Sequence, residues 1–456
     1  MPTNLYLPVE VKNRELHAKV LLAKHAAEWG FNVILGRKND LNELVVRMPP
    51  GVYLGLGAFE NFRPFFSKLK HLGFDVVVNE EEGLVTYSDR MYVDMRVSRE
   101  TLRQIDALFT WGGENQSVLA NAFPEFEGKF QVTGNPRFDL LKPRNQRVYA
   151  AEMEEIAARY GKFVLFCTSF SSINHFDKKL DYTKSLVDKK TLRSPESIEN
   201  FVRYREVKLR TFAAFLDAIP RLAASNPSVN IVVRPHPSEN MDIYREFEAR
   251  FPNVHVDARY SVHPWIIKAE ALVHHYCTTS IEALAAGTPR FALRPMKDEL
   301  SEKEIPFACS VECPSVEELL ARVSACLAVG KEHWREVPLS RDYSWYVSNI
   351  GEQLAAEAIV NRIAALCANS RPDDARGDGL QTLAARIAYS ARKSLRNARH
   401  GGRNQHYLDH KFPHLACDEV AAMLGAFGAD GLECRAFAGD FINIRRLPGR
   451  ENSGTH

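Results

Sequence analysis

The sequence lacks the features that mark a secreted, disulfide-bonded or membrane-spanning protein. No basic leader followed by an apolar run opens the chain, so no signal peptide is expected. No stretch of about 18 apolar residues occurs, so a membrane-spanning helix is not expected either. The 8 cysteines are scattered and form no Cys-x-x-Cys pair, which favours reduced thiols over disulfides or a zinc site. We therefore expect a cytoplasmic protein.

The chain also lacks a strong charge of one sign and a metal-binding motif. Its 59 basic residues nearly balance its 57 acidic ones, so the net charge is only +2 and nucleic acid is not expected as a partner. No cluster such as Asp-x-Asp presents carboxylates to a divalent ion, so neither a metal nor another cofactor is expected. A chain of 456 residues, of which 45% are hydrophobic, is long enough for two globular domains.

What the sequence does contain is an alternation of apolar runs and helical patterns. Apolar residues recur at helical spacing in 14–29, 62–72 and 199–224, and a glycine follows the first two of these segments. Strands separated by helices predict parallel sheets with helices on both faces, which is an α/β fold of two Rossmann-like lobes. The strand-like runs lie at 5–9, 32–35, 52–56, 74–78, 107–111, 129–133, 162–167, 230–233, 254–256 and 271–273.

The domain boundaries are expected where this pattern changes. The first lobe would span 1–148, and the second would span 149–338. A long amphipathic helix is expected within 339–369. A helical C-terminal extension, 370–456, would follow after a linker that is rich in Arg, Gly and Asp.

Three adjacent glutamates form the first candidate site. Ligands of parallel sheets bind beyond the carboxyl ends of strands, and Glu80, Glu81 and Glu82 follow the strand at 74–78. Adjacent carboxylates repel one another, so the pKa of one of them is expected to rise, which suits a general base near neutral pH. The alternative is a solvated acidic turn.

The second candidate site is the segment Arg-Pro-His-Pro at 234–237, directly after the strand at 230–233. Its two prolines restrict the backbone around His236 and thereby the direction of the imidazole ring. Arg234 suits an anionic ligand, and His236 can donate a proton or a hydrogen bond to a phosphate leaving group. The alternative is a rigid loop that carries an incidental histidine.

Hydroxyl residues form the third candidate site. Thr278, Thr279 and Ser280 follow the strand at 271–273, where a helix should begin. Backbone amides and hydroxyls at a helix N-terminus bind phosphate, and Glu282 in the first turn is expected to hold ribose hydroxyls. The alternative is an ordinary helix cap.

Taken together, these sites resemble a known family. The order of an acidic pair before glycine, a His-Pro and a Ser/Thr cluster resembles bacterial sialyltransferases and capsular Kdo transferases, which use CMP-activated ulosonic acids. The string Glu-Ala-x-x-x-Gly-Thr-Pro at 282–289 is similar to the nucleotide-side helix of GT-B glycosyltransferases. More closely, the chain resembles the bacterial surface carbohydrate biosynthesis protein family. The segments that carry this resemblance are 7–15, 80–84, 132–139, 233–240 and 277–283.

The resemblance implies a metal-independent glycosyltransferase that adds a sugar, such as Kdo or a sialic-acid-like sugar, to a growing surface polysaccharide. Its active site would lie in a cleft that the two lobes face, with a glycan or lipid-linked glycan acceptor on the first lobe and the nucleotide-sugar donor on the second. The helix within 339–369 would cross back over both lobes, as in GT-B folds.

The resemblance also assigns roles to residues. Glu81 would be the base, with Glu82 beside it, and His236 would meet the CMP phosphate. The family usually has an aspartate in the acidic motif, whereas this chain has only glutamates, so the choice among the three stays open. The nucleotide- and phosphate-binding residues would be Arg234, His236, Pro237, Thr278, Thr279, Ser280 and Glu282. The substrate-binding residues would be Glu10, Lys12, Ser169 and Asn174.

Three other functions fit the same motifs. A CDP-alditol phosphotransferase of the teichoic-acid type also carries an Arg-x-His-Pro. A UDP-sugar epimerase shares the two-lobe fold and a Gly-Asn-Pro segment. A nucleotide-sugar or glycan-binding assembly protein would need no catalytic glutamate, so it should tolerate the loss of all three.

A basic segment in the C-terminal extension suggests a membrane surface as a partner. Residues 381–403 contain no acidic residue and place basic and apolar side chains on different helical faces. Such a helix can lie on the anionic inner face of the cell membrane, where lipid-linked acceptors are found. The alternative is a helix that packs on its own protein, with its arginines solvated or paired to aspartates. The basic residues are Arg386, Arg392, Lys393, Arg396, Arg399 and Arg403, the apolar ones Leu383, Ile387, Ala391, Leu395 and Ala398, and the aspartates Asp373, Asp374 and Asp378.

Overall fold

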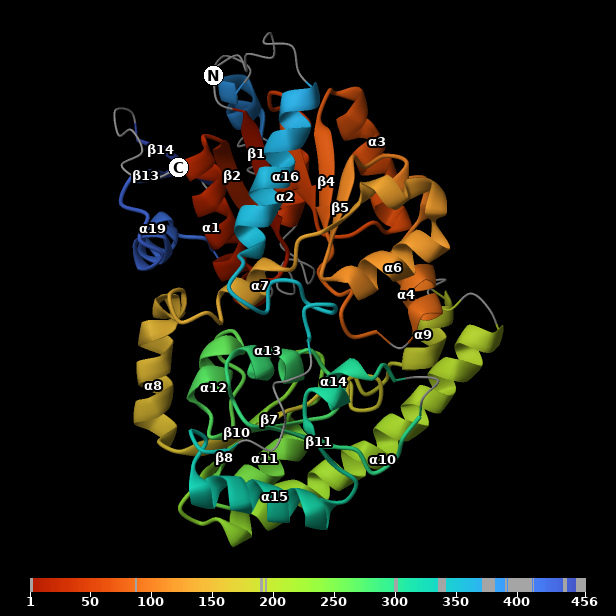
Figure 1. Ribbon diagram of the computed structural model, residues 1–456, viewed down its shortest axis with the longest axis vertical. Coiled ribbons are helices and arrows are strands. Elements are labelled where there is room, and N and C mark those ends of the chain that lie inside the picture. The colour runs from red at the N-terminus through yellow and green to blue at the C-terminus, as the bar shows by residue number, and fades with distance from the viewer. Residues whose placement is uncertain are drawn as a thin grey trace. The chain divides into compact units, whose positions relative to one another are not determined.

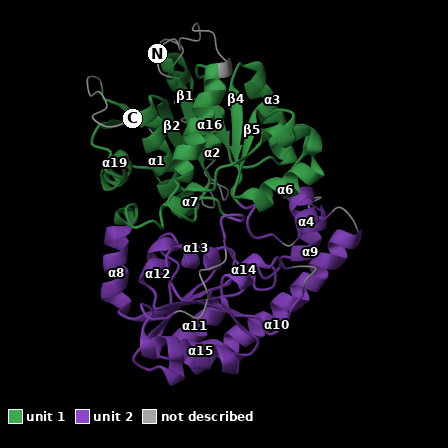
Figure 2. Cartoon of the chain, viewed as in Figure 1, with its two compact units in different colours: residues 1–81, 96–148, 347–456 green, residues 82–95, 149–346 purple. Residues whose placement is uncertain are grey.

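A computed structural model gives the fold of the chain (Figure 1). The chain forms two compact units, shown in different colours in Figure 2. The first unit comprises Met1–Glu81, Arg96–Val148 and Val347–His456, and the second comprises Glu82–Met95 and Tyr149–Tyr346. The structure describes residues 3–86, 88–188, 192, 195–298, 302–334, 342–370, 382–389, 392, 412, 414–437 and 441–447.

The first unit is built on an eight-stranded sheet in the order β13-β14-β2-β1-β3-β4-β5-β6. Its strands β1 to β6 pair in parallel, as the alternation of strands and helices predicts. Near-continuous apolar runs form the central strands because helices cover both faces of such a sheet, and Leu5, Leu7 and Val9 of β1 are fully buried. These strands are β1 (Asn4–Val9), β2 (Asn32–Arg37), β3 (Val52–Gly55), β4 (Asp75–Asn79), β5 (Ala107–Thr110) and β6 (Phe130–Val132).

Helix α1 (Lys12–Trp29) shows how the sequence ends an element of this unit. Gly30 follows it with φ 115°, and its N–H donates to the carbonyl oxygens of Ala26 and Ala27, which is the left-handed cap that glycine favours. The unit's other helices are α2 (Lys38–Val45), η1 (Glu60–Phe62), α3 (Arg63–His71), α5 (Arg99–Leu102), α6 (Gly113–Ala122), η2 (Pro124–Lys129), α7 (Pro136–Asp139), α16 (Ala355–Ser370) and α19 (Cys417–Ala426).

The start of α16 is fixed by residues far away in the sequence. Asp139 accepts hydrogen bonds from the N–H groups of Ala355 and Ala356, at 3.0 and 2.8 Å, and so caps the helix. The buried Asn349 donates to Asp139 Oδ1 at 2.6 Å, and Gly134 packs so closely that a Cβ there would collide with Asn349. The helix expected within 339–369 therefore begins only at Ala355, and the Gly-Asn-Pro-Arg-Phe-Asp segment that precedes it in sequence serves to dock it.

The C-terminal extension adds strands as well as helix to the first unit. Strand β13 (Leu432–Phe437) pairs with β14 (Phe441–Arg446), which pairs antiparallel with β2. The ring of Phe441 lies against Gly36 of β2, where any Cβ would displace it. The sequence pattern does not predict this hairpin. Residues 393–403 of the expected basic helix lie outside the described part of the chain, as do Asp373, Asp374 and Asp378.

The second unit has a six-stranded sheet, all parallel, in the order β12-β11-β10-β7-β8-β9. Its strands are β7 (Phe163–Cys167), β8 (Asn230–Arg234), β9 (Val254–Val256), β10 (Ala271–His274), β11 (Arg290–Leu293) and β12 (Val311–Cys313). The remaining helices include α4 (Asp89–Arg96) and η3 (Gln146–Tyr149), each of which spans a boundary between the units in the sequence. The others belong to the second unit and are α8 (Ala150–Tyr160), α9 (Tyr182–Asp188), α10 (Pro195–Ser225), α11 (Asp242–Glu248), α12 (His263–Lys268), α13 (Thr279–Ala285), α14 (Ile305–Ala308) and α15 (Val316–Val329).

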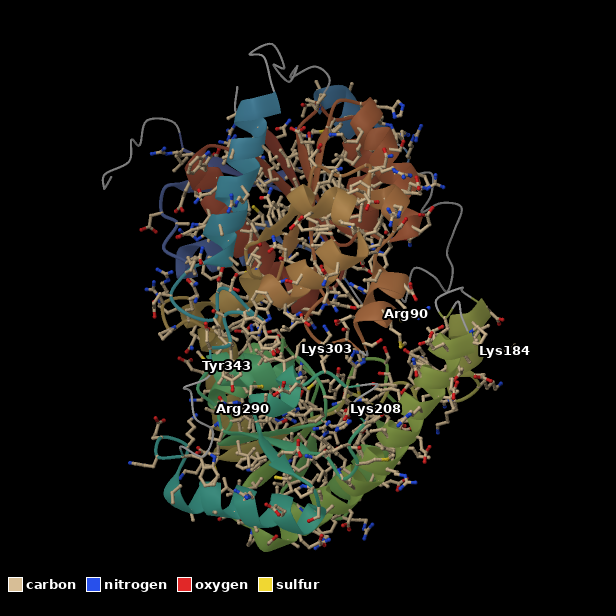
Figure 3. All side chains as sticks on the ribbon, turned by 45° about the vertical axis from the view of Figure 1, so that its right-hand side comes forward. Arg90, Lys184, Lys208, Arg290, Lys303 and Tyr343 are labelled. Carbon is tan, nitrogen blue, oxygen red and sulfur yellow. The ribbon has the colours of Figure 1, made fainter. Side chains whose placement is uncertain are left out.

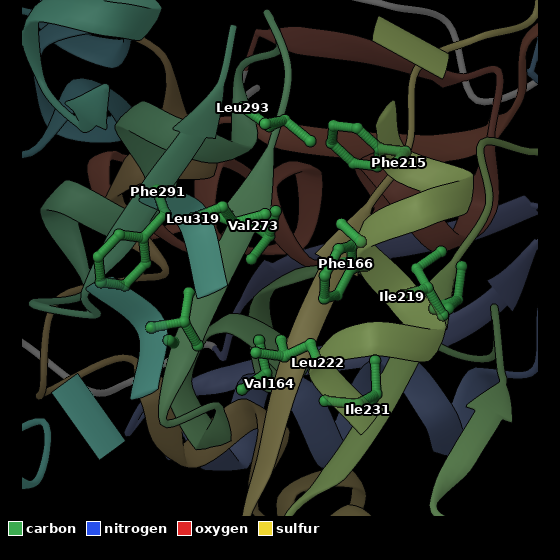
Figure 4. Close-up of a cluster of buried hydrophobic side chains, with 14 of the residues drawn as sticks. Val164, Phe166, Phe215, Ile219, Leu222, Ile231, Val273, Phe291, Leu293 and Leu319 are labelled. Atoms are coloured by element: carbon green, nitrogen blue, oxygen red, sulfur yellow. The ribbon is translucent and has the colours of Figure 1, made fainter. Parts of the chain in front are cut away.

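Alternation along β7 divides the second core between the two faces of the sheet. Val164 and Phe166 face the cluster drawn in Figure 4, which also contains Phe215 of α10 and Leu319 of α15. Phe163, Leu165 and Cys167 face a second cluster on the other side of the sheet. The two clusters hold β7 in the middle of the sheet, so the loop that follows it starts from a rigid position.

Candidate functional site

The loops after β7, β8 and β10 meet at one edge of the second sheet. Parallel strands end at the same edge, and β7 lies directly between β8 and β10. Thr168, after β7, accepts a hydrogen bond from the backbone N–H of His236, after β8, at 3.3 Å. Ser169, after β7, donates to the carbonyl oxygen of His275, after β10, at 2.9 Å. The second and third candidate sites of the sequence therefore belong to one connected edge.

Glu239 holds two of these loops together, and the sequence analysis did not single it out. It is 2% exposed, and it accepts hydrogen bonds from the Thr168 hydroxyl, the Phe170 N–H and the Tyr244 hydroxyl, at 2.9, 2.8 and 2.6 Å. Burial raises the pKa of Glu239, and these hydrogen bonds oppose the rise. The only sequence signal was its place in the segment 233–240, two residues after the second proline.

His236 is an exposed side chain whose ring is oriented by its own loop. Its Nδ1 accepts a hydrogen bond from the backbone N–H of Ser238 at 3.2 Å, and it lies 3.0 Å from the Ser171 hydroxyl. A backbone N–H can only donate, so Nδ1 carries no proton and Nε2 carries it in the neutral ring. The exposed ring therefore has a hydrogen-bond donor at Nε2, as binding to a phosphate oxygen requires.

Arg234 has a different environment from the expected one. Its guanidinium donates to the carbonyl oxygens of Arg259 and Tyr260, at 2.7 and 2.6 Å, in the segment after β9. It also lies 5.9 Å from the centre of the Trp265 ring. These contacts show that Arg234 stabilises that segment and that its guanidinium is not an open anion site. Pro237, the residue after His236, is exposed.

The hydroxyl cluster divides into half-buried and buried members. Thr278 precedes α13 but makes no capping hydrogen bond with its side chain, so the alternative of an ordinary side-chain cap does not apply to it. The Thr279 hydroxyl lies 2.5 Å from the Cys277 thiol. Ser280 is fully buried and donates to the Cys277 carbonyl oxygen at 2.8 Å. Thr278 and Thr279 are therefore the members that a ligand can reach.

Glu282 also departs from its expected role. It is fully buried, and its Oε1 lies 3.5 Å from Nε2 of His263 in α12, whose Nδ1 is 3.0 Å from the Tyr149 hydroxyl. A carboxylate enclosed between α13 and α12 does not meet ribose hydroxyls in this structure. Asn174 likewise makes a loop contact, because its side-chain amide donates to the carbonyl oxygen of Asn240 at 3.0 Å.

The three adjacent glutamates lie in three different environments. Glu80 is 1% exposed and its Oε1 is 3.2 Å from Nη2 of Arg96. Glu81 is buried against Lys19 of α1, with 2.9 Å between Oε1 and Nζ, while Glu82 is exposed. Glu80 and Glu81 each contact a different cation, which offsets the repulsion expected between adjacent carboxylates. The three glutamates therefore do not form one shared acidic site.

The pKa of Glu81 moves opposite to the expectation for a general base. Burial raises it, but the attraction and hydrogen bond of Lys19 and a 3.0 Å hydrogen bond from Asn79 outweigh burial, so the net shift is downward. The pKa of the neighbouring Glu15 is raised instead. Burial and the nearby negative charge of Glu81 raise it, and the positive charge of Arg14 only partly opposes them. Glu81 therefore has the properties of a structural ion-pair partner.

Glu10 and Lys12, expected at a substrate site, also have protein partners. Glu10 pairs with Lys38 at 2.6 Å. Lys12 donates to the His414 carbonyl oxygen and pairs with Glu419 of α19, at 2.9 and 2.6 Å, so it links α1 to the C-terminal extension. Within the described ranges, no group of three or more His, Cys, Asp or Glu side chains is placed to hold a metal ion.

Comparisons with known proteins support the fold assignment. The sequence matches no protein-family model and no curated protein. Among solved structures, a putative UDP-N-acetylglucosamine 2-epimerase from Listeria monocytogenes is 14% identical, with a TM-score of 0.53 over 82% of this chain and 99% of that chain. The UDP-GlcNAc 2-epimerase of Methanocaldococcus jannaschii is 13% identical, with a TM-score of 0.50 over 79% and 99%. The wall teichoic acid polymerase TagF is 11% identical, with a TM-score of 0.50 over 81% and 90%. The chain thus has the GT-B type fold of two Rossmann-like units.

The burial of Glu81 generates a stability prediction. Glu81→Gln removes one partner of a buried ion pair and should lower the free energy of unfolding by about 3 kcal/mol. Glu28→Gln is the control, because Glu28 forms a partly exposed pair with Lys24 within α1 and should change stability by less than about 1 kcal/mol. Urea unfolding of both variants measures the difference. Equal stability of the two variants would contradict the structural role of Glu81.

Proposed function

We propose that this chain is a glycosyltransferase that moves a sugar from a nucleotide-activated donor onto a bacterial surface polysaccharide. The favoured donor is a CMP-activated ulosonic acid, such as Kdo or a sialic-acid-like sugar. The orientation of His236 carries the proposal, because an exposed imidazole with its proton on Nε2 suits a departing phosphate at a strand-end edge. The GT-B type fold, which nucleotide-sugar enzymes share, supports it.

The chemistry needs one group for the leaving phosphate and one for the acceptor. His236 would donate a hydrogen bond to the phosphate oxygen as the sugar–phosphate bond breaks, with Thr278 and Thr279 nearby in the same unit. A carboxylate would take the proton of the acceptor hydroxyl while the oxygen of that hydroxyl forms its bond to the anomeric carbon. We propose that no metal takes part, so protein donors would stabilise the phosphate charge.

Glu82 is the preferred base among the three glutamates. Its side chain is exposed, and it belongs to the same compact unit as His236. Glu80 and Glu81 are buried and paired with Arg96 and Lys19. A carboxylate whose pKa is lowered by an ion pair is a weak base, so Glu81 is the less suitable base.

Two other reactions are kept as alternatives because solved structures with this fold include UDP-GlcNAc 2-epimerases and a wall teichoic acid polymerase. A UDP-sugar epimerase would interconvert two nucleotide sugars without an acceptor, and a CDP-alditol phosphotransferase would release CMP while transferring the alditol phosphate to an acceptor hydroxyl. Analysis of the products separates all three reactions. A glycosyltransferase releases the free nucleoside phosphate or diphosphate and extends the glycan by one sugar.

The first functional prediction concerns the base. Glu82→Gln should lower kcat by about 10²- to 10⁴-fold, because general-base catalysis is lost, while the melting temperature stays unchanged. Glu81→Gln should instead lower the melting temperature and keep most of its turnover when it is assayed well below that temperature. The assay is sugar transfer onto a polysaccharide acceptor. Full turnover by Glu82→Gln would rule out this assignment.

The second prediction concerns the nucleotide. CMP should raise the melting temperature, because a ligand that binds only the folded state stabilises it. His236→Ala and Thr279→Val should reduce this shift, whereas His333→Ala, an exposed histidine elsewhere in the same unit, should not. A shift with UDP and none with CMP would overturn the CMP-sugar assignment and keep the transferase. Loss of activity in EDTA would contradict metal independence.

We also propose that the helical residues 382–389 belong to a membrane-surface segment. Leu383 and Ile387 are 51% and 61% exposed, whereas Tyr389 is buried against the ring of Phe441. The apolar pair on the outer face is therefore available to a lipid surface, with Arg386 and the basic residues up to 403 supplying charge. No helix in the described part of the chain has both the length and the apolar character needed to cross a membrane.

The third prediction tests this surface. The full chain should co-sediment with anionic liposomes at low salt and release at high salt, since each cation near such a membrane contributes about 1 kcal/mol. Leu383→Ser with Ile387→Ser, which leaves the β13–β14 hairpin in place, should weaken this binding. Equal, salt-insensitive sedimentation of the wild-type and the doubly substituted chain would assign the segment to internal packing.

A further inference from the structure

Helix α10 carries a lysine on its buried face. Tyr204, Val207, Lys208 and Thr211 follow at helical spacing on the side that packs against the sheet, and Lys208 is 0% exposed. Figure 3 labels it on α10 within the second unit. A lysine is rarely fully buried unless it is paired, so this position calls for an explanation.

The ammonium group of Lys208 lies beneath the strand-end edge described above. Its Nζ donates to the Ser169 hydroxyl at 3.0 Å. Three aromatic rings surround it, with ring centres at 5.3 Å for Tyr204, 5.5 Å for Phe170 and 5.9 Å for Tyr276. Tyr276 follows β10 with φ 44°, a backbone conformation that non-glycine residues rarely adopt and that marks functional loops.

This charge has no carboxylate in direct contact with it among the described residues, although Glu302 and Glu239 attract it from beyond ion-pair distance. The ammonium group of Lys208 has three N–H donors, and the Ser169 hydroxyl accepts from only one of them. Burying a charge without a direct ion pair is costly, and the aromatic rings and the more distant carboxylates offset only part of that cost. Burial accordingly lowers the pKa of Lys208 to about 8, against the opposing influence of Cys277, Glu302 and Glu239. A buried ammonium group that destabilises the fold in this way is expected where an anionic ligand binds to it.

Ser169 connects this charge to the site. It lies half-buried on the loop after β7, accepts from Lys208 and donates its own proton to the His275 carbonyl oxygen. Rotation of the hydroxyl away from that carbonyl would point its proton at a ligand. The Lys208 charge behind the serine would then favour an anionic ligand over a neutral one.

We propose that Ser169 and Lys208 form an anion subsite at the strand-end edge of the second unit, in which Ser169 contacts the phosphate or carboxylate oxygens of the donor and Lys208 supplies the positive charge from behind. This inference deepens the proposed function and rests on it for the identity of the donor. Lys208 is a positioning residue, because it acts through Ser169.

The melting temperature distinguishes a ligand-binding lysine from a purely structural one. Replacing Lys208 should raise the melting temperature in the first case and lower it in the second. Lys208→Met keeps the length of the side chain and removes the unpaired charge, so the melting temperature should rise by several degrees at pH 7. Lys184→Met, on the exposed surface of α9, is the matched control and should change it little. A lower melting temperature for Lys208→Met would assign the lysine to structure and overturn the proposal.

The gain in melting temperature should depend on pH. The lowered pKa means that the folded protein loses this proton more readily than the unfolded chain, so the cost of the charge is full below pH 8 and fades toward pH 10.5. The difference between Lys208→Met and wild type should therefore shrink from pH 7 to pH 9.5. The groups that also face the ammonium are Cys277, Glu302, Glu239, His274 and His275.

Binding measurements test the ligand chemistry directly. Calorimetry at pH 7 should show that Lys208→Met weakens CMP about tenfold or more and leaves cytidine within about twofold, because only CMP carries phosphate. Ser169→Ala should weaken CMP in the same selective way while keeping the lysine. N-acetylneuraminate and its methyl ester provide the corresponding pair for a carboxylate, so the two pairs identify which anion occupies the subsite.

Each remaining outcome decides between the two proposals. If UMP binds in place of CMP, the donor assignment fails. The subsite is then tested by comparing how much Lys208→Met weakens the binding of UMP and of uridine. If no nucleotide binds, the test moves to inorganic phosphate. An equal loss for charged and neutral ligands in Lys208→Met, or no anion binding by the wild-type protein, would overturn the anion subsite.

Discussion

The candidate site depends on the single carboxylate of Glu239. Parallel strands bring the ends of β7, β8 and β10 to one edge, but they do not fix the loops that follow. Glu239 fixes two of those loops by accepting from Thr168, from the Phe170 N–H and from Tyr244. Buried carboxylates that satisfy several donors at once rigidify their surroundings. The orientation of His236 and the position of Ser169 both follow from this arrangement.

Buried charges in the two units illustrate two different uses of the same chemistry. Glu81 and Lys19 compensate each other within the first unit, so their pair specifies how α1 packs near the end of β4. Lys208 in the second unit has aromatic rings and one hydroxyl instead of a carboxylate. The first arrangement contains its own ion pair, whereas in the second no carboxylate of the described residues touches the ammonium, which is the basis of the anion subsite that we propose.

Much of the fold could be predicted from the sequence because long apolar runs separated by helical patterns define parallel sheets. The first ten strands were predicted in this way. Strands β11 and β12 were not predicted, although they are as long as β3 and β6, which were. The β13–β14 hairpin was missed because its half-exposed strands carry several arginines, as edge strands commonly carry charges.

Site residues were predictable only where their chemistry is local. The prolines around His236 indicate a fixed ring, and the geometry agrees with that interpretation. The role of Glu81 depends on Lys19, which lies 62 positions away, and adjacent glutamates gave no sign of it. Lys208 did leave a signal, since a lysine stands on the apolar face of the segment 199–224. Its significance depends on Ser169 and three rings that only the tertiary structure brings together.

The attachment of β14 to β2 affects the order in which the chain can fold. The first unit takes strands from both sides of the inserted second unit, whose main stretch, Tyr149–Tyr346, is continuous in sequence. During synthesis that stretch can reach its native state while the first sheet still has β2 as an unpaired edge. Only when residues beyond 430 leave the ribosome can Phe441 settle on Gly36 and cover that edge. Until then, β2 offers its backbone to any other strand, so the C-terminal hairpin protects the finished chain, but not the growing one, from self-association at this edge.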